Sequence, residues 1–163
     1  MAQILQTYSS MLFRSLGYTC VLTLWALIFA MVIGLIFALC NVSHCKPLNI
    51  LGSIYVDAIR GVPLIVLAYF IYFGVPQAFR FAGINNFRLP ALQAGTIALA
   101  LNCGAYMAEI FRAGIESIDK GQMEAGRSLG LTYGTTMRTV VLPQALRVMI
   151  PFIINQFIIT LKD

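Results

Sequence analysis

"SLGYTCVLTLWALIFAMVIGLIFALCNVS", residues 15–43, contains no Asp, Glu, Lys or Arg. Two further charge-free runs cover residues 61–79 and 89–108. A helix rises about 1.5 Å per residue and the hydrocarbon core of a bilayer is about 30 Å thick, so about 20 apolar residues cross it. Each run is long enough to cross. The sequence therefore predicts an integral membrane protein built from helices.

The composition agrees with this interpretation and excludes two others. Hydrophobic residues make up 60% of the chain and charged residues only 10%, whereas soluble domains carry about 25% charged residues. A secretory signal has an apolar stretch of roughly 7–15 residues and a small-residue cleavage site, and the first run is longer and lacks such a site. A transmembrane β-barrel would show short alternating strands. We therefore predict one all-α, polytopic transmembrane bundle over residues 1–163.

The distribution of positive charge predicts an orientation. Lys and Arg concentrate on the cytoplasmic side of membrane helices. If the first helix runs from outside to inside, seven basic residues fall on the cytoplasmic side and three, Arg14, Arg80 and Arg88, outside. The seven are Lys46, Arg60, Arg112, Lys120, Arg127, Arg138 and Arg147. We expect an outside N-terminus in a cytoplasmic membrane, and this topology explains the net charge of +5 without nucleic acid.

The fourth apolar segment, "VMIPFIINQFIITL" at residues 148–161, is shorter than the others. It would cover about 21 Å as a helix, less than the hydrocarbon thickness. Either Arg147 lies inside the membrane or the helix continues beyond Asp163. We expect the sequence to be a truncated piece of a longer protein.

The polar stretch before this segment contains helix signals. Asp119 with Gln122 three residues later has the form of a capping box, so a short helix is expected to begin there. Gly130 would end it, and Thr132 would cap a second helix that Pro143 bends or interrupts. The sequence predicts two short helices joined at a glycine turn and lying along the membrane surface.

The first of these helices has little side-chain bulk. Glu124, Ala125 and Gly126 follow one another in it. Small residues allow another backbone to approach closely, and the carboxylate adds one directional acceptor. This favours docking into a groove on a soluble partner, and a polar loop without a partner is the alternative.

The same residues carry a resemblance to a known family. Glu124-Ala125-Gly126, Gly130, Val140 and Leu142-Pro143 match EAA-x3-G-x9-I-x-LP, the signature loop of ABC importer permeases. The segments "RGVPLIVLAYFIYFGVP", "LNCGAYMAEIFRAGIESIDKGQ" and "VVLPQALRVMIPFIINQFIITLKD" resemble permeases for polar amino acids, and the resemblance covers residues 15–163. Two residues depart from the family pattern. Gly126 stands where the pattern has alanine, and glycine weakens a helix by roughly 0.5–1 kcal/mol relative to alanine. Asp119 stands where the pattern has proline.

The resemblance implies a mechanism and partners. The loop at about residues 112–143 would be a cytoplasmic coupling loop, seated in a cleft of a separate ATP-binding subunit that drives amino acid import. An extracytoplasmic amino-acid-binding protein would deliver the substrate, and a second permease subunit, identical or different, would complete the pathway. A fifth membrane helix would follow the "LKD" segment. The implied ATPase-coupling residues are Glu124, Ala125, Gly126, Gly130, Leu142 and Pro143.

A second group of residues is expected along the substrate pathway. The resemblance places Asn102, Tyr106, Gln156, Lys162 and Asp163 there. Glu109 is added because ionisable groups at membrane depth usually face a cavity or mark a pathway. Lys162 and Asp163 together would suit the carboxylate and ammonium groups of an amino acid, and a snorkelling lysine beside a helix-terminal acid is the alternative.

Other chemistry finds little support. The sequence has no GxxxxGK[ST] phosphate loop, so neither a nucleotide site nor a cofactor is expected in this chain. Cys40, His44 and Cys45 fit no common zinc spacing, and the four cysteines are expected to be buried free thiols. No nucleophile–base constellation indicates an enzyme. An ATP-independent secondary transporter or channel is the rival function, but no inverted repeat or glycine-broken helix pair favours it. A small structural membrane subunit is a further alternative.

Overall fold

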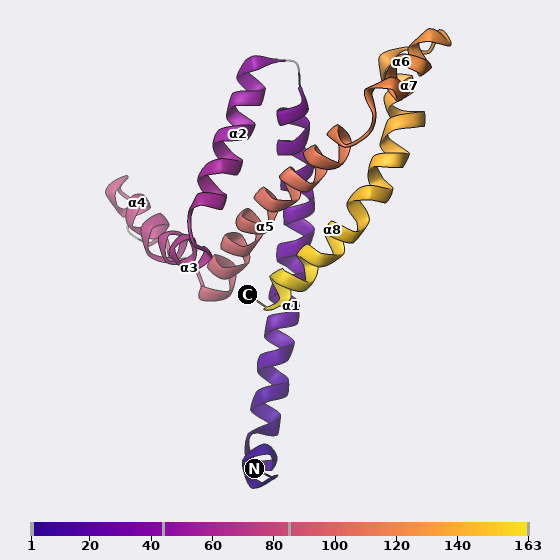
Figure 1. Ribbon diagram of the computed structural model, residues 1–163. Coiled ribbons are helices and arrows are strands. Elements are labelled where there is room, and N and C mark those ends of the chain that lie inside the picture. Colours follow the sequence, from indigo (N-terminus) through magenta and orange to yellow (C-terminus); the bar gives the residue numbers. More distant parts are fainter. Residues whose placement is uncertain (1, 44, 85, 163) are drawn as a thin grey trace.

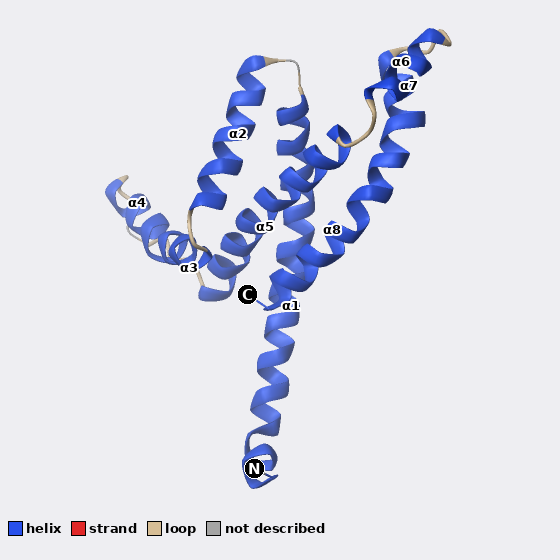
Figure 2. Cartoon of the chain, viewed as in Figure 1, coloured by secondary structure: helices blue, strands red, loops and turns tan. Residues whose placement is uncertain are grey.

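The computed structural model describes residues 2–43, 45–84 and 86–162, and within these ranges every regular element is a helix (Figure 2). The predicted all-α fold is confirmed. Two of the elements, η1 and η2, are π-helical. In chain order the elements are α1 (Ala2–Val42), α2 (Lys46–Gly61), α3 (Leu64–Tyr69), η1 (Phe70–Gly74), α4 (Val75–Phe81), α5 (Ala91–Glu116), α6 (Lys120–Ser128), α7 (Tyr133–Thr136), η2 (Met137–Val141) and α8 (Leu142–Lys162).

Four helical stretches are long and apolar enough to cross a membrane, as the sequence predicts. They are Tyr8–Val42, Leu64–Phe81, Ala91–Glu116 and Tyr133–Lys162. The fourth is much longer than its uncharged stretch suggested, because the helix already begins at Tyr133 and runs through Arg147. Arg147 therefore lies within a continuous helix.

The centre of the fold is the contact between α1 and α5, the most extensive between any two elements (Figure 1). Ala26, Ala30, Gly34 and Ala38 recur every four residues on α1 and are all buried. A β-carbon at Gly34 would lie 2.5 Å from Met107 Cβ of α5. Small residues at i, i+4 spacing let two membrane helices approach closely, and packing is the main source of stability between helices in lipid. This stripe fixes α5 against α1.

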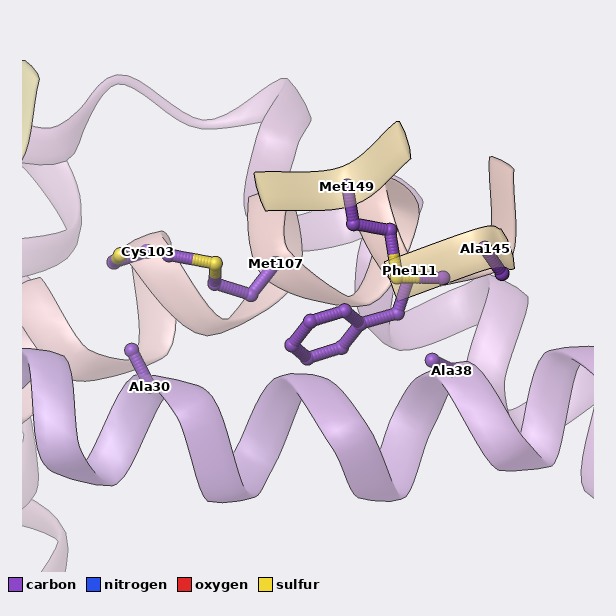
Figure 3. Packing of buried hydrophobic residues seen from close by; sticks show 7 residues of the cluster. All are labelled: Ala30, Ala38, Cys103, Met107, Phe111, Ala145 and Met149. Carbon is purple, nitrogen blue, oxygen red and sulfur yellow. The ribbon is translucent and has the colours of Figure 1, made fainter. Parts of the chain in front are cut away.

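Helix α8 completes the core from the other side of α5. Cys103, Met107 and Phe111 follow one another at four-residue spacing on α5 and belong to one buried cluster with Ala145 and Met149 of α8 (Figure 3). Ala30 and Ala38 of α1 belong to the same cluster. The three longest helices therefore share one apolar core, and apolar side chains on their outer faces are exposed.

Helix α2 is an element that the charge count did not anticipate. Tyr55 stacks on Phe37 of α1 with ring centroids 3.8 Å apart, and its hydroxyl donates to the Leu101 carbonyl of α5 at 2.8 Å. The helix therefore packs beside α1 and α5. Lys46 and Arg60 lie at its two ends, about 21 Å apart at 1.5 Å per residue. The placement of both residues on the cytoplasmic side stays a prediction, and the structure adds that a 16-residue helix separates Lys46 from Arg60.

Each π-helical segment is followed by an α-helix whose second residue is a proline. The Val75 N–H donates to Phe70 O ahead of Pro76, and the Leu142 N–H donates to Met137 O ahead of Pro143. In an α-helix the proline ring would clash with the carbonyl four residues earlier. The wider π turn relieves this crowding. Each span thus continues through its proline.

The cysteines differ in part from the expectation. Cys103 is buried, as predicted, whereas Cys20 and Cys45 are exposed and Cys40 is half-buried. Among the described residues no cluster of His, Cys, Asp or Glu could hold a metal, and His44 lies outside them.

Candidate functional site

The polar helix α6 begins where the sequence predicts. Asp119 is its N-cap, and the carboxylate accepts a hydrogen bond from the Gly121 N–H at 2.6 Å. Caps of this kind contribute about 1 kcal/mol to helix stability. The cap fixes the start of α6, which is separated from the end of α5 by three residues.

Gly130 ends α6, also as predicted. Its φ of 83° lies in the left-handed region that favours glycine. The Gly130 N–H donates to Arg127 O, and the Leu131 N–H donates to Gly126 O. These two bonds form a Schellman motif, which satisfies carbonyls at the helix end and reverses the chain.

Thr132 caps the next helix, α7, by accepting from the Thr135 N–H at 3.3 Å. The prediction of a separate second short helix was wrong, because α7 runs through η2 into α8 and forms the start of the fourth span. Helix α5 also continues to Glu116. The segment between the third and fourth spans is therefore shorter than residues 112–143, and α6 is its main element.

Glu124 and Ala125 are exposed on α6, but Gly126 is buried. A β-carbon at position 126 would overlap the Thr136 methyl group and lie 2.8 Å from its hydroxyl. Gly126 therefore faces α7, not a partner. The missing methyl group at this position makes room for Thr136.

Leu142 and Pro143 lie at the start of α8, where Leu142 is half-buried and Pro143 is exposed. The next residue, Gln144, donates a hydrogen bond from Nε2 to the Gln122 Oε1 atom of α6 at 3.4 Å. The start of α8 and helix α6 are thus in contact. The structure gathers all six predicted coupling residues in the α6–α8 corner, seen at the upper right of Figure 1.

Three of the predicted pathway residues meet in one pocket. Asn102 and Tyr106 of α5 and Gln156 of α8 line a cavity of 430 Å³, together with Arg60 and the segment Gly61–Leu64. Asn102 and Gln156 are buried polar side chains, which are uncommon in a membrane core. Polar groups from three helices therefore converge on one cavity.

Lys162 and Glu109 are not part of this pocket. Lys162 is exposed in the last turn of α8. Glu109 receives two bonds from Arg112, one from Nη2 and one from Nε at 3.1 Å, and it lines a different cavity between α5 and α8. Asp163 lies outside the described residues. The paired use of Lys162 and Asp163 for the two ends of an amino acid thus has no support from the position of Lys162.

The α6–α8 corner and the pocket can now be compared with known proteins. Residues 30–163 match the family model of the binding-protein-dependent transport system inner membrane component. The chain belongs to this family. It is a multi-pass membrane component of a transport system and not an enzyme, as the sequence predicted.

Two relatives of this inner membrane component come from Bacillus subtilis (strain 168). The probable glutamine ABC transporter permease protein GlnM is 40% identical, over 94% of this chain and 68% of the relative. The L-cystine transport system permease protein TcyB is 43% identical, over 97% of this chain and 64% of the relative. The chain thus spans about two thirds of the length of these relatives.

Solved structures give the same family fold. The crystal structure of an amino acid ABC transporter with histidines superposes with a TM-score of 0.88 at 40% identity, covering 98% of this chain and 72% of that one. An inward-facing structure of the MetNI methionine ABC transporter has a TM-score of 0.65 at 19% identity, covering 99% and 73% of the two chains. The second likeness shows the fold alone.

Arg60 is the pocket residue of this inner membrane component that sequence reasoning missed. Its guanidinium carbon lies 5.3 Å from the centroid of the Tyr106 ring, within cation–π range. In the sequence it counts only as one of the basic residues that indicate orientation. The sequence after Arg60 could have indicated its position. Gly61 and Pro63 predict a break between two helices, which leaves Arg60 at a helix end.

Proposed function

We propose that this chain is the transmembrane subunit of an ATP-driven importer of polar amino acids in the cytoplasmic membrane. One observation carries the proposal: a single helix, α8, runs from the α6–α8 corner to the pocket. Gln144 near its start is bonded to α6, and Gln156 on the same helix lines the pocket. These two residues are about 18 Å apart along the axis.

This connection suggests how ATP hydrolysis is coupled to transport. Glu124 and Ala125 present an exposed, low-bulk face that suits a groove on a cytoplasmic ATP-binding subunit. A displacement of α6 would pass to α8 through the Gly126–Thr136 contact and the Gln122–Gln144 bond. Because α8 shares a packed core with α5, it would move as a stiff element and reshape the pocket.

The pocket chemistry suits a zwitterionic amino acid. The planar guanidinium of Arg60 can bind a carboxylate through two parallel hydrogen bonds. The amides of Asn102 and Gln156 offer both donors and acceptors to the ammonium group or a polar side chain. We propose Arg60, Asn102, Tyr106 and Gln156 as the substrate-contacting set.

The proposed partners follow from the family and the relatives. They are a cytoplasmic ATP-binding subunit, an extracytoplasmic amino-acid-binding protein and a second permease subunit, identical or different. The N-terminus would lie outside. With Arg60 removed from the count, six basic residues against three still favour this orientation.

Co-purification of the full-length permease with its ATP-binding subunit tests the coupling role of α6. The comparison is wild type against Glu124→Lys. We expect wild type to retain the ATP-binding subunit, and the reversed charge either to release it or to abolish the stimulation of ATP hydrolysis by the binding protein. Arg14→Glu, a charge reversal on α1 remote from α6, serves as the control and should behave as wild type. Equal behaviour of all three proteins would reject α6 as the docking element and favour an ATP-independent transporter.

A further inference from the structure

A second polar cavity lies at the end of the α3–η1–α4 span, away from the pocket and from α6. It has a volume of 560 Å³ and is lined by side chains of η1, α4 and the segment before α5. Its charged groups are Arg80 and Arg88, and its walls include Tyr72, Phe73 and Phe87. Nothing in the proposed transport mechanism uses these residues.

The chain folds back on itself to bring the two arginines to one cavity. Helix α4 ends in a second Schellman motif, in which Gly83, at φ 90°, donates to Arg80 O and the Ile84 N–H donates to Phe79 O. Phe87 then packs on Phe79 with ring centroids 4.4 Å apart. The cavity is therefore held by backbone and aromatic contacts on both sides.

In the part of the chain that the structure describes, neither guanidinium group has a counter-charge. Within residues 2–43, 45–84 and 86–162, neither Arg80 nor Arg88 has a carboxylate within ion-pair distance, whereas Arg112 pairs with Glu109 and Glu116. Two exposed, unpaired arginines at one cavity form a site for an anion with several acceptor oxygens, such as a phosphate group.

The surroundings are apolar, which identifies the class of anion. Phe81 is 85% exposed, and Ile84 and Phe79 are also exposed beside the cavity. The outer face of the same span presents Ile65, Val66 and Phe70. Aromatic residues and arginines at the end of a membrane span mark the headgroup level. An amphiphile would fit both the arginines and the apolar face, because its headgroup would bind the arginines while its acyl chains lie along the apolar side chains.

We propose that Arg80 and Arg88 bind the phosphate of an anionic phospholipid at this end of the bundle. Helix α5 begins beside this cavity and ends close to α6. The bound lipid would therefore lie in the leaflet opposite the α6–α8 corner. Tyr72 and Gln77, which also line the cavity, can hydrogen-bond to headgroup oxygens.

The test is native mass spectrometry of the full-length permease in detergent, titrated with dioleoylphosphatidylglycerol or dioleoylphosphatidylcholine. We expect wild type to prefer the anionic lipid. The Arg80→Gln/Arg88→Gln variant should bind it roughly tenfold more weakly or worse, as expected when charge-assisted hydrogen bonds are lost. Arg80→Lys/Arg88→Lys should recover part of the affinity, and Arg14→Gln should match wild type.

An unchanged lipid affinity in the glutamine double variant, or an equal loss in Arg14→Gln, would overturn the proposal. If the double variant keeps its lipid affinity but loses stimulation by the binding protein, the surface belongs to an acidic soluble partner. Inorganic phosphate alone should not displace the lipid, and full displacement by phosphate would replace the lipid site with a free-anion site.

Discussion

Gly126 of α6 packs directly on Thr136 of α7, and both residues are buried. This contact explains the glycine at a position where the family pattern has alanine. Thr136 occupies the space that an alanine methyl group would need. The two positions therefore form a matched pair, and a change at one is expected to depend on the residue at the other.

Gly126→Ala should destabilise the α6–α7 corner by about 1–3 kcal/mol, because the added methyl group overpacks a filled site. The double variant Gly126→Ala/Thr136→Ala should recover most of this loss, since the threonine side chain that blocks the methyl group is gone. Thermal unfolding of the purified full-length permease, completed as a double-mutant cycle, measures the coupling. Gly134→Ala is the control, because a β-carbon there has no neighbour within 4 Å. Strictly additive effects would show that the contact is not tight.

The α1–α5 interface gives a second prediction. Gly34→Ala should lower the unfolding temperature, because the new β-carbon would meet Met107 Cβ and the α5 backbone, neither of which can rotate away. Gly17→Ala on the same helix has open space and should raise the unfolding temperature, because alanine is favoured over glycine in a helix by roughly 0.5–1 kcal/mol. Differential scanning fluorimetry in one detergent compares the pair. Stabilisation by both substitutions would contradict the close approach of α1 and α5.

Arg60 gives a third prediction, which rests on the proposed function. Arg60→Gln should raise the substrate concentration for half-maximal uptake roughly tenfold or more, the loss expected when a charged hydrogen bond is removed. Arg60→Lys should be intermediate, because lysine keeps the charge but lacks the planar fork. Tyr106→Phe retains the ring next to the guanidinium, so it should raise the substrate concentration for half-maximal uptake less than Tyr106→Leu does.

Uptake into proteoliposomes that contain the complete transporter supplies this measurement. Lys46→Gln, at the other end of α2, is the matched control and should leave uptake unchanged. An Arg60→Gln transporter with normal uptake would remove Arg60 from the substrate-contacting set and leave the cavity without a carboxylate partner.

Local rules predicted much of this structure from the sequence. Asp119, Gly130 and Thr132 act at helix ends as expected, because capping depends on side chains within a few residues of each other. The charge-free runs located the spans for a similar reason, since crossing a bilayer is decided by length and composition.

Features that depend on distant segments were missed. Arg60 reaches the pocket only because α2 packs on α1 and α5, and its spacing in the sequence carries no sign of Gln156 on α8. The burial of Gly126 likewise depends on a reversal of the chain that brings Thr136 back onto α6. The alanine and glycine stripe of α1 was visible in the sequence, but its partner helix was not.

The π-helical segment before Pro143 has a consequence for the rotational phase of α8. A π turn holds one residue more than an α turn, and each residue turns a helix by about 100°. If residues 137–141 closed into a regular α-helix, everything after them would rotate by that angle relative to α6, and Gln144 and Gln156 would face new neighbours. Pro143 opposes this change, because its ring would then collide with the Thr139 carbonyl. Pro143 thus fixes the rotational register of α8 relative to α6.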